Sequence, residues 1–211
     1  MNKTVTPKRI VIALIAAGVL AGTTSFAYGL GHERAAAATG ALIAGAEAPS
    51  AAIDLPIQEP GAHTMRVELD GADFIRNHAD DWGGAVVSWS GSIATTDGTW
   101  EGNDTTVQGG GAIAAWAGSA TVDGDAFSAN GSAKNGGAIA VGGAVVVSDG
   151  TFDDNEASEN GGAIYAGGAV SSVNGSYSDN TAWTGSGGAI FSNTGSISSV
   201  SDVFYRNWAL G

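Results

Sequence analysis

Carboxylates are the side chains in this sequence whose spacing could support chemistry. They gather at Asp80–Asp81, at Asp123 with Asp125, at Asp149 and at Asp153–Asp154. Two carboxylates that flank a glycosidic bond can hydrolyse it, and a carboxylate beside a base is the equipment of a polysaccharide lyase. The same residues are also common in solvated turns, because Asp hydrogen-bonds the nearby backbone. The carboxylates therefore leave catalysis, cation binding and simple turns as alternatives.

The groups that would complete a catalytic site are absent from the pattern. Arg76 and Arg206 lie near opposite ends of the acidic region, and Lys134 is isolated. No Ser-His-Asp arrangement, metal-ligand spacing or phosphate-binding loop is present, and the three histidines do not share one face of the expected fold: His32, His63 and His78. We expect no catalytic residue, no cofactor and no enzymatic activity. The alternative is a carbohydrate-active protein of the lyase or hydrolase type.

Two alternating motifs define the elements that must position these side chains. An aromatic-x-x-Asn motif recurs at spacings of 26, 27, 25, 25 and 27 residues, and a Gly-Gly-Ala-Ile/Val motif at spacings of 27, 26, 25 and 26. The several glycines in each unit disfavour helical repeats. Three short strands with their corners use about 25 residues, which is one coil of a parallel β-helix. The fourth unit, for example, predicts strands at 163–166, 169–173 and from 176.

Equivalent positions in successive coils should stack into three columns inside the solenoid. The aromatic column gains stacking energy, and the asparagines accept left-handed corners and bond the copies above and below. The paired glycines allow a positive φ at another corner. The columns are the aromatic Phe74, Trp100, Phe127, Phe152, Tyr177 and Phe204, the asparagines Asn77, Asn103, Asn130, Asn155, Asn180 and Asn207, and the aliphatic Val86, Ile113, Ile139, Ile164 and Ile190.

Two surface features could bind a ligand. Asp154 and Asp179 hold the same repeat position, so they should lie about 5 Å apart on adjacent coils and are the candidates for calcium. Trp82, Trp183 and Trp208 follow the asparagines in segments of variable length. They could form a platform for a glycan or a surface protein, or each could simply pack over its own loop.

The motif pair resembles the repeat of the chlamydial polymorphic outer membrane proteins, which recurs in autotransporter-like proteins. The resemblance covers residues 74–211, with Trp100 and Tyr177 in place of Phe and Val86 in place of Ile. It implies a right-handed, single-stranded parallel β-helix of about five to six coils, display as a passenger on the cell surface or outer membrane, and a role as stalk or adhesin. The family's C-terminal translocator barrel has no counterpart here, so we expect the repeats to be truncated at the C-terminus.

The N-terminal third is organised differently. Lys3, Lys8 and Arg9 precede an apolar run at 10–22 and a Ser-Phe-Ala cleavage pattern, which predicts a signal peptide over residues 1–27. Residues 28–61, with three prolines, read as a flexible leader, and residues 62–73 as a strand that caps the solenoid.

Charge and composition limit the partners. Cleavage of the signal peptide leaves five basic residues against 21 acidic ones, a net charge of −16. Such an anion does not attract nucleic acid. The chain has no cysteine, so disulfides do not brace it, and no apolar stretch after the signal is long enough to make the mature chain membrane-spanning. An uncapped C-terminal coil could associate end to end with another chain.

Overall fold

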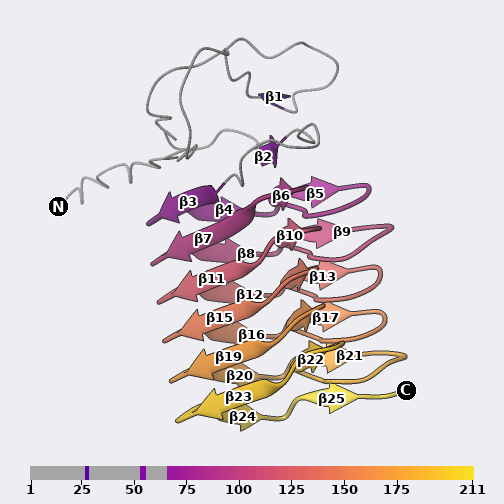
Figure 1. The fold of residues 1–211 in the computed structure, drawn as a ribbon. Helices are drawn as coiled ribbons and strands as arrows, with labels where there is room; N and C mark the ends of the chain where they lie inside the picture. Colours follow the sequence, from indigo (N-terminus) through magenta and orange to yellow (C-terminus); the bar gives the residue numbers. More distant parts are fainter. Residues whose placement is uncertain (1–26, 29–52, 56–65) are drawn as a thin grey trace, which may run out of the picture.

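The computed structural model describes residues 27–28, 53–55 and 66–211. The predicted signal peptide and nearly all of the predicted leader lie outside the described residues. Within 66–211 the chain forms short strands and no helix. The strands build a parallel β-solenoid of six turns that stack along one axis (Figure 1). The predicted fold class, an all-β parallel solenoid, is confirmed.

Each complete turn contributes one strand to each of four sheets, so one more strand is present per turn than the three that the sequence predicts. The unpredicted strand is two residues long and follows each asparagine, because the corner at that residue still leaves room to pair with the turns above and below.

The strands are numbered along the chain, and every pairing between turns is parallel. Sheet I contains β2 (Ile53–Leu55), β6 (Val86–Ser88), β10 (Ile113–Ala115), β14 (Ile139–Val141), β18 (Ile164–Ala166) and β22 (Ile190–Ser192), with β1 (Ala27–Tyr28) antiparallel to β2. Sheet II contains β3 (Arg66–Asp70), β7 (Ser92–Thr96), β11 (Ala120–Asp123), β15 (Val145–Ser148), β19 (Val170–Val173) and β23 (Ile197–Val200).

The other two sheets hold the aromatic-x-x-Asn motif and the residues that follow it. Sheet III contains β4 (Asp73–Ile75), β8 (Thr99–Glu101), β12 (Ala126–Ser128), β16 (Thr151–Asp153), β20 (Ser176–Ser178) and β24 (Val203–Tyr205). Sheet IV contains β5 (His78–Ala79), β9 (Asp104–Thr105), β13 (Gly131–Ser132), β17 (Glu156–Ala157), β21 (Thr181–Ala182) and β25 (Trp208–Ala209). The strand β3, inside the predicted capping segment 62–73, is the outermost member of sheet II and buries Val67 and Leu69.

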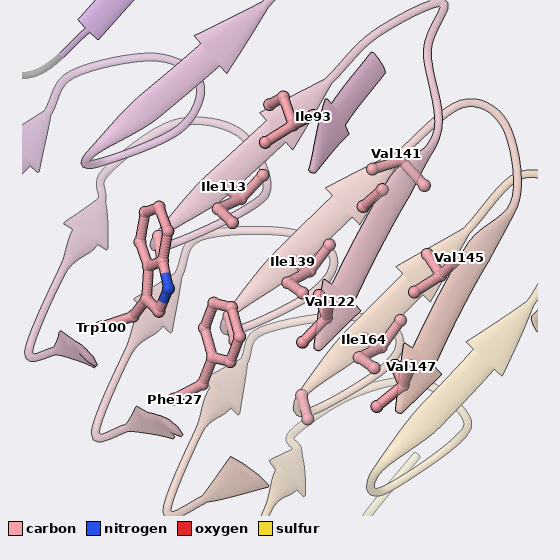
Figure 2. Packing of buried hydrophobic residues seen from close by; sticks show 14 of the residues in the cluster. Ile93, Trp100, Ile113, Val122, Phe127, Ile139, Val141, Val145, Val147 and Ile164 are labelled. Atoms are coloured by element: carbon pink, nitrogen blue, oxygen red, sulfur yellow. The ribbon is translucent and has the colours of Figure 1, made fainter. Parts of the chain in front are cut away.

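Two columns of apolar side chains fill the interior (Figure 2). Ile113 pairs in register with Ile139, and Ile139 with Ile164, so these aliphatic side chains stack on one another within sheet I. Neighbouring rings of the aromatic column are stacked nearly parallel, and the centroids of each consecutive pair lie 4.3–5.4 Å apart. One turn cannot enclose its own apolar face, so stacking of neighbours stabilises the solenoid.

The sharp corners are left-handed, but not where the sequence predicts them. The residue before each asparagine has the positive φ, as in Ala129 (52°) and Asp154 (53°), whereas the ladder asparagines have ordinary backbone. The expectation that the asparagines themselves take this conformation was wrong, because their buried side chains must point along the solenoid axis. Further left-handed corners lie three residues before each aromatic and at the first glycine of each pair.

The second glycine of each pair is needed for a different reason. A Cβ on Gly137 would lie 2.1 Å from the carbonyl oxygen of Gly162 in the next turn and 2.6 Å from the backbone nitrogen of Glu156. Only a residue without a side chain permits this approach between turns.

Candidate functional site

The asparagine column forms a continuous hydrogen-bonded ladder inside the solenoid. Asn103 donates its side-chain amide to Asn130 Oδ1 over 2.9 Å and to the carbonyl of Phe74 over 2.9 Å. Its own Oδ1 accepts the backbone N–H (3.0 Å) and the side-chain amide (2.7 Å) of Asn77. The pattern repeats down to Asn207, whose amide donates to the carbonyl of Tyr177. The ladder thus pairs the backbone groups that each corner removes from the sheets.

Asp125 is a buried carboxylate outside the ladder, and the sequence pattern did not distinguish it from the exposed carboxylates. Asp125, only 1 % exposed, accepts hydrogen bonds at Oδ1 from the Thr95 hydroxyl (2.7 Å), the Gly98 N–H (2.8 Å) and the Trp100 indole N–H (3.1 Å). Its Oδ2 accepts the N–H of Asp123. Burial raises the pKa of Asp125, and the four donors oppose that rise. The sequence had suggested a solvated turn here, as for its neighbour Asp123.

The same arrangement recurs three turns later. Asp202 accepts the Gly175 N–H (2.6 Å) and the Ser172 hydroxyl (3.0 Å), and Ser172 contacts the Tyr177 hydroxyl over 2.8 Å. Desolvation raises the pKa of Tyr177 above its ordinary value. Asp125 and Asp202 each accept a hydrogen bond from a corner glycine of the preceding turn, Gly98 or Gly175. A Cβ at that glycine would approach the carboxylate oxygen.

This recurrence explains the two departures from Phe in the aromatic column. Trp100 and Tyr177 carry a polar group on the ring, and each has a hydroxyl residue five positions earlier and an Asp 25 positions later. Phe127 and Phe152 instead have Val122 and Val147 at the hydroxyl position, which are fully buried. The spacing was the available sequence signal. The chemistry is structural, because both oxygens of Asp125 and both oxygens of Asp202 accept hydrogen bonds from neighbouring groups of the protein.

The carboxylates considered for catalysis do not converge. Asp81, Asp123 and Asp149 are exposed, and Asp80 projects almost fully into solvent. The Asp149 carboxylate accepts the Asn174 side-chain amide over 3.1 Å, and that of Asp153 accepts the Ser178 hydroxyl. These contacts join residues of adjacent turns on the solvent face and place no two carboxylates around a common cleft.

The calcium candidates lie at left-handed corners on adjacent turns, as their shared repeat position implies. Asp154 is exposed, and Asp179 forms an ion pair with Arg206 over 3.1 Å, so one of the two carboxylates already has a cationic partner. Within the described part of the chain, no three His, Cys, Asp or Glu side chains come together in a way that could hold a metal ion.

One histidine has an acidic environment. His78 Nδ1 lies 2.7 Å from Asp104 Oδ2 on the next turn, and Nε2 lies 3.5 Å from Asp80. The hydrogen bond to Asp104 raises the pKa of His78. Its side chain is half exposed, so this cluster is a surface ion pair of small energetic weight.

The three tryptophans of the predicted platform do not lie together. Trp82, between β5 and β6, packs edge-on against Trp116 with centroids 4.9 Å apart. Trp116 was not singled out from the sequence. Trp183 follows β21 and Trp208 lies in β25, which pairs with β21, so these two exposed rings are on adjacent turns of one face at the other end of the solenoid. The Trp183 indole donates to Glu156 Oε2 over 3.4 Å.

Comparison with known families rests on one repeat unit. The model of the Chlamydia polymorphic membrane protein repeat matches residues 149–167, a segment that contains the Phe152-x-x-Asn155 motif, the strand β16 and the next Gly-Gly-Ala-Ile. The chain carries a polymorphic membrane protein repeat. The copies of the aromatic-x-x-Asn motif on either side of this segment occupy equivalent places in the solenoid, with Phe152 in register with Phe127 and Tyr177.

No curated protein and no solved structure matches the chain. Among the described residues, no helix has the length and apolar character needed to cross a membrane.

Proposed function

We propose that the chain is an exported, non-enzymatic surface protein whose solenoid acts as a stalk or adhesin. The observation that carries the proposal is the unbroken register of the repeat. Each turn from Phe74 to Ile190 places an aromatic, an asparagine and an aliphatic residue at the same buried positions, which is an economical way to build a rigid rod. A rod with uniform interior and variable exterior suits display rather than turnover.

The family of the repeat supports the location. Polymorphic membrane proteins are surface proteins, and the positive and apolar pattern of residues 1–27 is that of a secretory signal. The high acidic content of the solenoid keeps such a rod soluble outside the cell and free of nucleic acid. The absence of cysteine is compatible with export because the ladder and the columns stabilise each turn without disulfides.

The partner of the adhesin would be a surface protein or a glycan. Trp183 and Trp208 support this assignment, because exposed aromatic rings on one face offer apolar area and an indole N–H to a sugar ring or a protein side chain. The strong negative charge of the rod disfavours acidic glycans as ligands.

Export and adhesion can be tested separately. A fusion of the chain to a periplasmic reporter should lose its export when Lys3, Lys8 and Arg9 are replaced by Glu. Beads coated with the purified chain should bind cells or a neutral-glycan array, and Trp183→Ala should reduce the binding several-fold while Trp116→Ala, a change at an equally exposed tryptophan, should leave it intact.

The enzymatic alternative has its own assay. The purified chain is incubated with neutral and acidic polysaccharides, with and without calcium. Reproducible formation of new reducing or unsaturated ends, abolished by replacing a solvent-facing carboxylate, would contradict the proposal.

A further inference from the structure

Trp183 and Glu156 bring an aromatic ring and a carboxylate together on the outside of sheet IV. Trp183 is 49 % exposed, and its indole N–H donates to Glu156 Oε2 of the preceding turn. Glu156 lies on the outer face of β17 and is exposed as well. In the register of sheet IV its neighbours are Gly131, which has no side chain, and the short Thr181. The two side chains form one exposed aromatic and anionic unit, which we call the Trp–Glu pair.

The Trp–Glu pair is held by paired backbone inside the series of turns. The N–H of Trp183 donates to the carbonyl of Ala157 over 3.0 Å. The chain then continues through a further turn, in which the N–H of Leu210 donates to the carbonyl of Ala182. Trp183 therefore has a neighbouring turn on each side. Because its backbone is already fixed, the ring loses little conformational freedom when a ligand binds.

The negative charge around the Trp–Glu pair is almost entirely uncompensated. Residues 79–205 contain 14 acidic side chains and a single basic one, Lys134. Within the described part of the chain, none of the ion pairs includes Glu156. A cation that pairs with Glu156 would therefore come from a ligand, and the field of the whole acidic rod attracts such a ligand.

Charge complementarity favours a basic protein segment, and among basic side chains it favours arginine. The planar guanidinium of arginine stacks on an aromatic face and donates two N–H groups to one carboxylate. Trp183 and Glu156 offer both partners side by side. A neutral sugar would use the ring but leave the carboxylate without a counter-charge, and an anionic glycan would be repelled.

Trp116 shows what an exposed ring offers without a carboxylate. It is 57 % exposed, but its ring packs edge-on against Trp82. Residues 105–122, which surround it in the sequence, contain no charged side chain. Trp183 is thus distinguished from Trp116 by its acidic partner and not by its exposure.

We propose that the Trp–Glu pair binds an arginine side chain in a basic segment of a surface protein. The inference rests on the proposed adhesin function, for which it names the chemistry of the partner. The test uses the purified full chain and a fluorescent peptide of alternating glycine and arginine. The same peptide with citrulline, the uncharged isostere of arginine, is the reference. Fluorescence anisotropy should show binding of the arginine peptide that weakens with added salt, and much weaker binding of the citrulline peptide.

Variants locate the contact on the surface. Trp183→Ala should weaken binding of the arginine peptide by about two- to fivefold, as expected for an exposed contact between a cation and a ring. Glu156→Gln should weaken binding by a similar factor. The matched controls are Trp116→Ala and Glu101→Gln. The latter removes the same charge from the outer face of β8 in sheet III, and both controls should leave the affinity nearly unchanged.

Several results would overturn the proposal. One is equal binding of the two peptides, and another is an equal effect of Glu156→Gln and Glu101→Gln, which would indicate diffuse attraction to the acidic rod. Binding of coated beads to cells or neutral glycans that depends on Trp183 but not on Glu156 would also overturn it, while the adhesin function would stand. If the beads bind nothing, the adhesin function fails, and the peptide measurement still decides whether the Trp–Glu pair recognises arginine.

Discussion

At the scale of single residues, the asparagine ladder makes buried polar groups depend on one another between turns. Asn130 is 1 % exposed and is linked to Asn103, Trp100 and Asn155. Removal of its amide leaves the backbone N–H of Asn103, one of the two side-chain N–H groups of Asn103 and the carbonyl of Trp100 without these partners. An unpaired buried group costs about 1–3 kcal/mol, which is more than the net gain of a typical hydrogen bond.

We therefore expect Asn130→Ala to lower the free energy of unfolding by about 3 kcal/mol or more. The control Asn193→Ala changes an exposed asparagine and should alter stability by less than about 0.5 kcal/mol. Urea denaturation followed by far-UV circular dichroism measures both variants. Equal stability of the two would show that the ladder is not a source of stability.

Asp125 makes stability depend on pH in a direction opposite to that of a salt-bridged carboxylate. Its native pKa is raised by burial, so the folded state binds this proton more tightly than the unfolded state does. Relative to Asp125→Asn, which keeps an acceptor for Thr95 and Trp100, the wild type should gain stability as pH falls through the native pKa. The gain should level off below about 3.8, the pKa of the unfolded residue. Denaturation of both proteins from pH 7 to pH 3 measures the difference; a difference that stays constant with pH would contradict the assignment.

The residue scale also marks how far sequence reasoning reaches. Recurrence alone identified the asparagine and aromatic columns, because identical side chains at a 25–27-residue period must stack. It did not identify Asp125 or Asp202, since each is a single deviation whose meaning depends on Thr95 or Ser172 in another strand. The side-chain direction that buries these carboxylates is set by tertiary contact and not by local pattern.

At the scale of elements, the repeat fixes strand order and register, whereas the corners needed the structure. Strands near 164–166, 170–173 and 176–178 agree with the prediction. The strand Thr181–Ala182 was missed because a two-residue strand has no alternation to detect. The left-handed residue was placed one position too late, since Asn tolerates that conformation locally but is required for the ladder.

The two kinds of glycine in the strands and corners should respond differently to substitution. Gly137→Ala forces a Cβ against the backbone of the next turn and should lower stability by about 3 kcal/mol or more, or open the solenoid locally. Gly131→Ala places its Cβ 4.0 Å from the closest neighbouring atom and should be neutral or stabilise by up to about 1 kcal/mol. Thermal melts compare the two. A tolerated Gly137→Ala would mean that the turns can separate more easily than their hydrogen bonds imply.

At the scale of the whole molecule, nearest-neighbour stacking predicts that turns can be removed as units. Residues 136–160 form one 25-residue period, and Asn135 and Asn160 are equivalent positions joined by a side-chain hydrogen bond over 3.0 Å. Deletion of 136–160 brings Asn135 before Gly161 in the same phase, so every column and the ladder continue without a break.

We expect this deletion to fold into a five-turn solenoid whose denaturant m-value is lower by about one sixth, because m scales with the surface exposed on unfolding. Deletion of 136–157 removes three fewer residues and shifts Tyr177, Asn180 and their neighbours by three positions relative to Phe127 and Asn130, so the chain on one side of the junction should lose its protection. Hydrogen exchange of both proteins distinguishes the outcomes. If the in-phase deletion unfolds as completely as the shifted one, stability comes from a unique central nucleus and the repeat is not the unit of the fold.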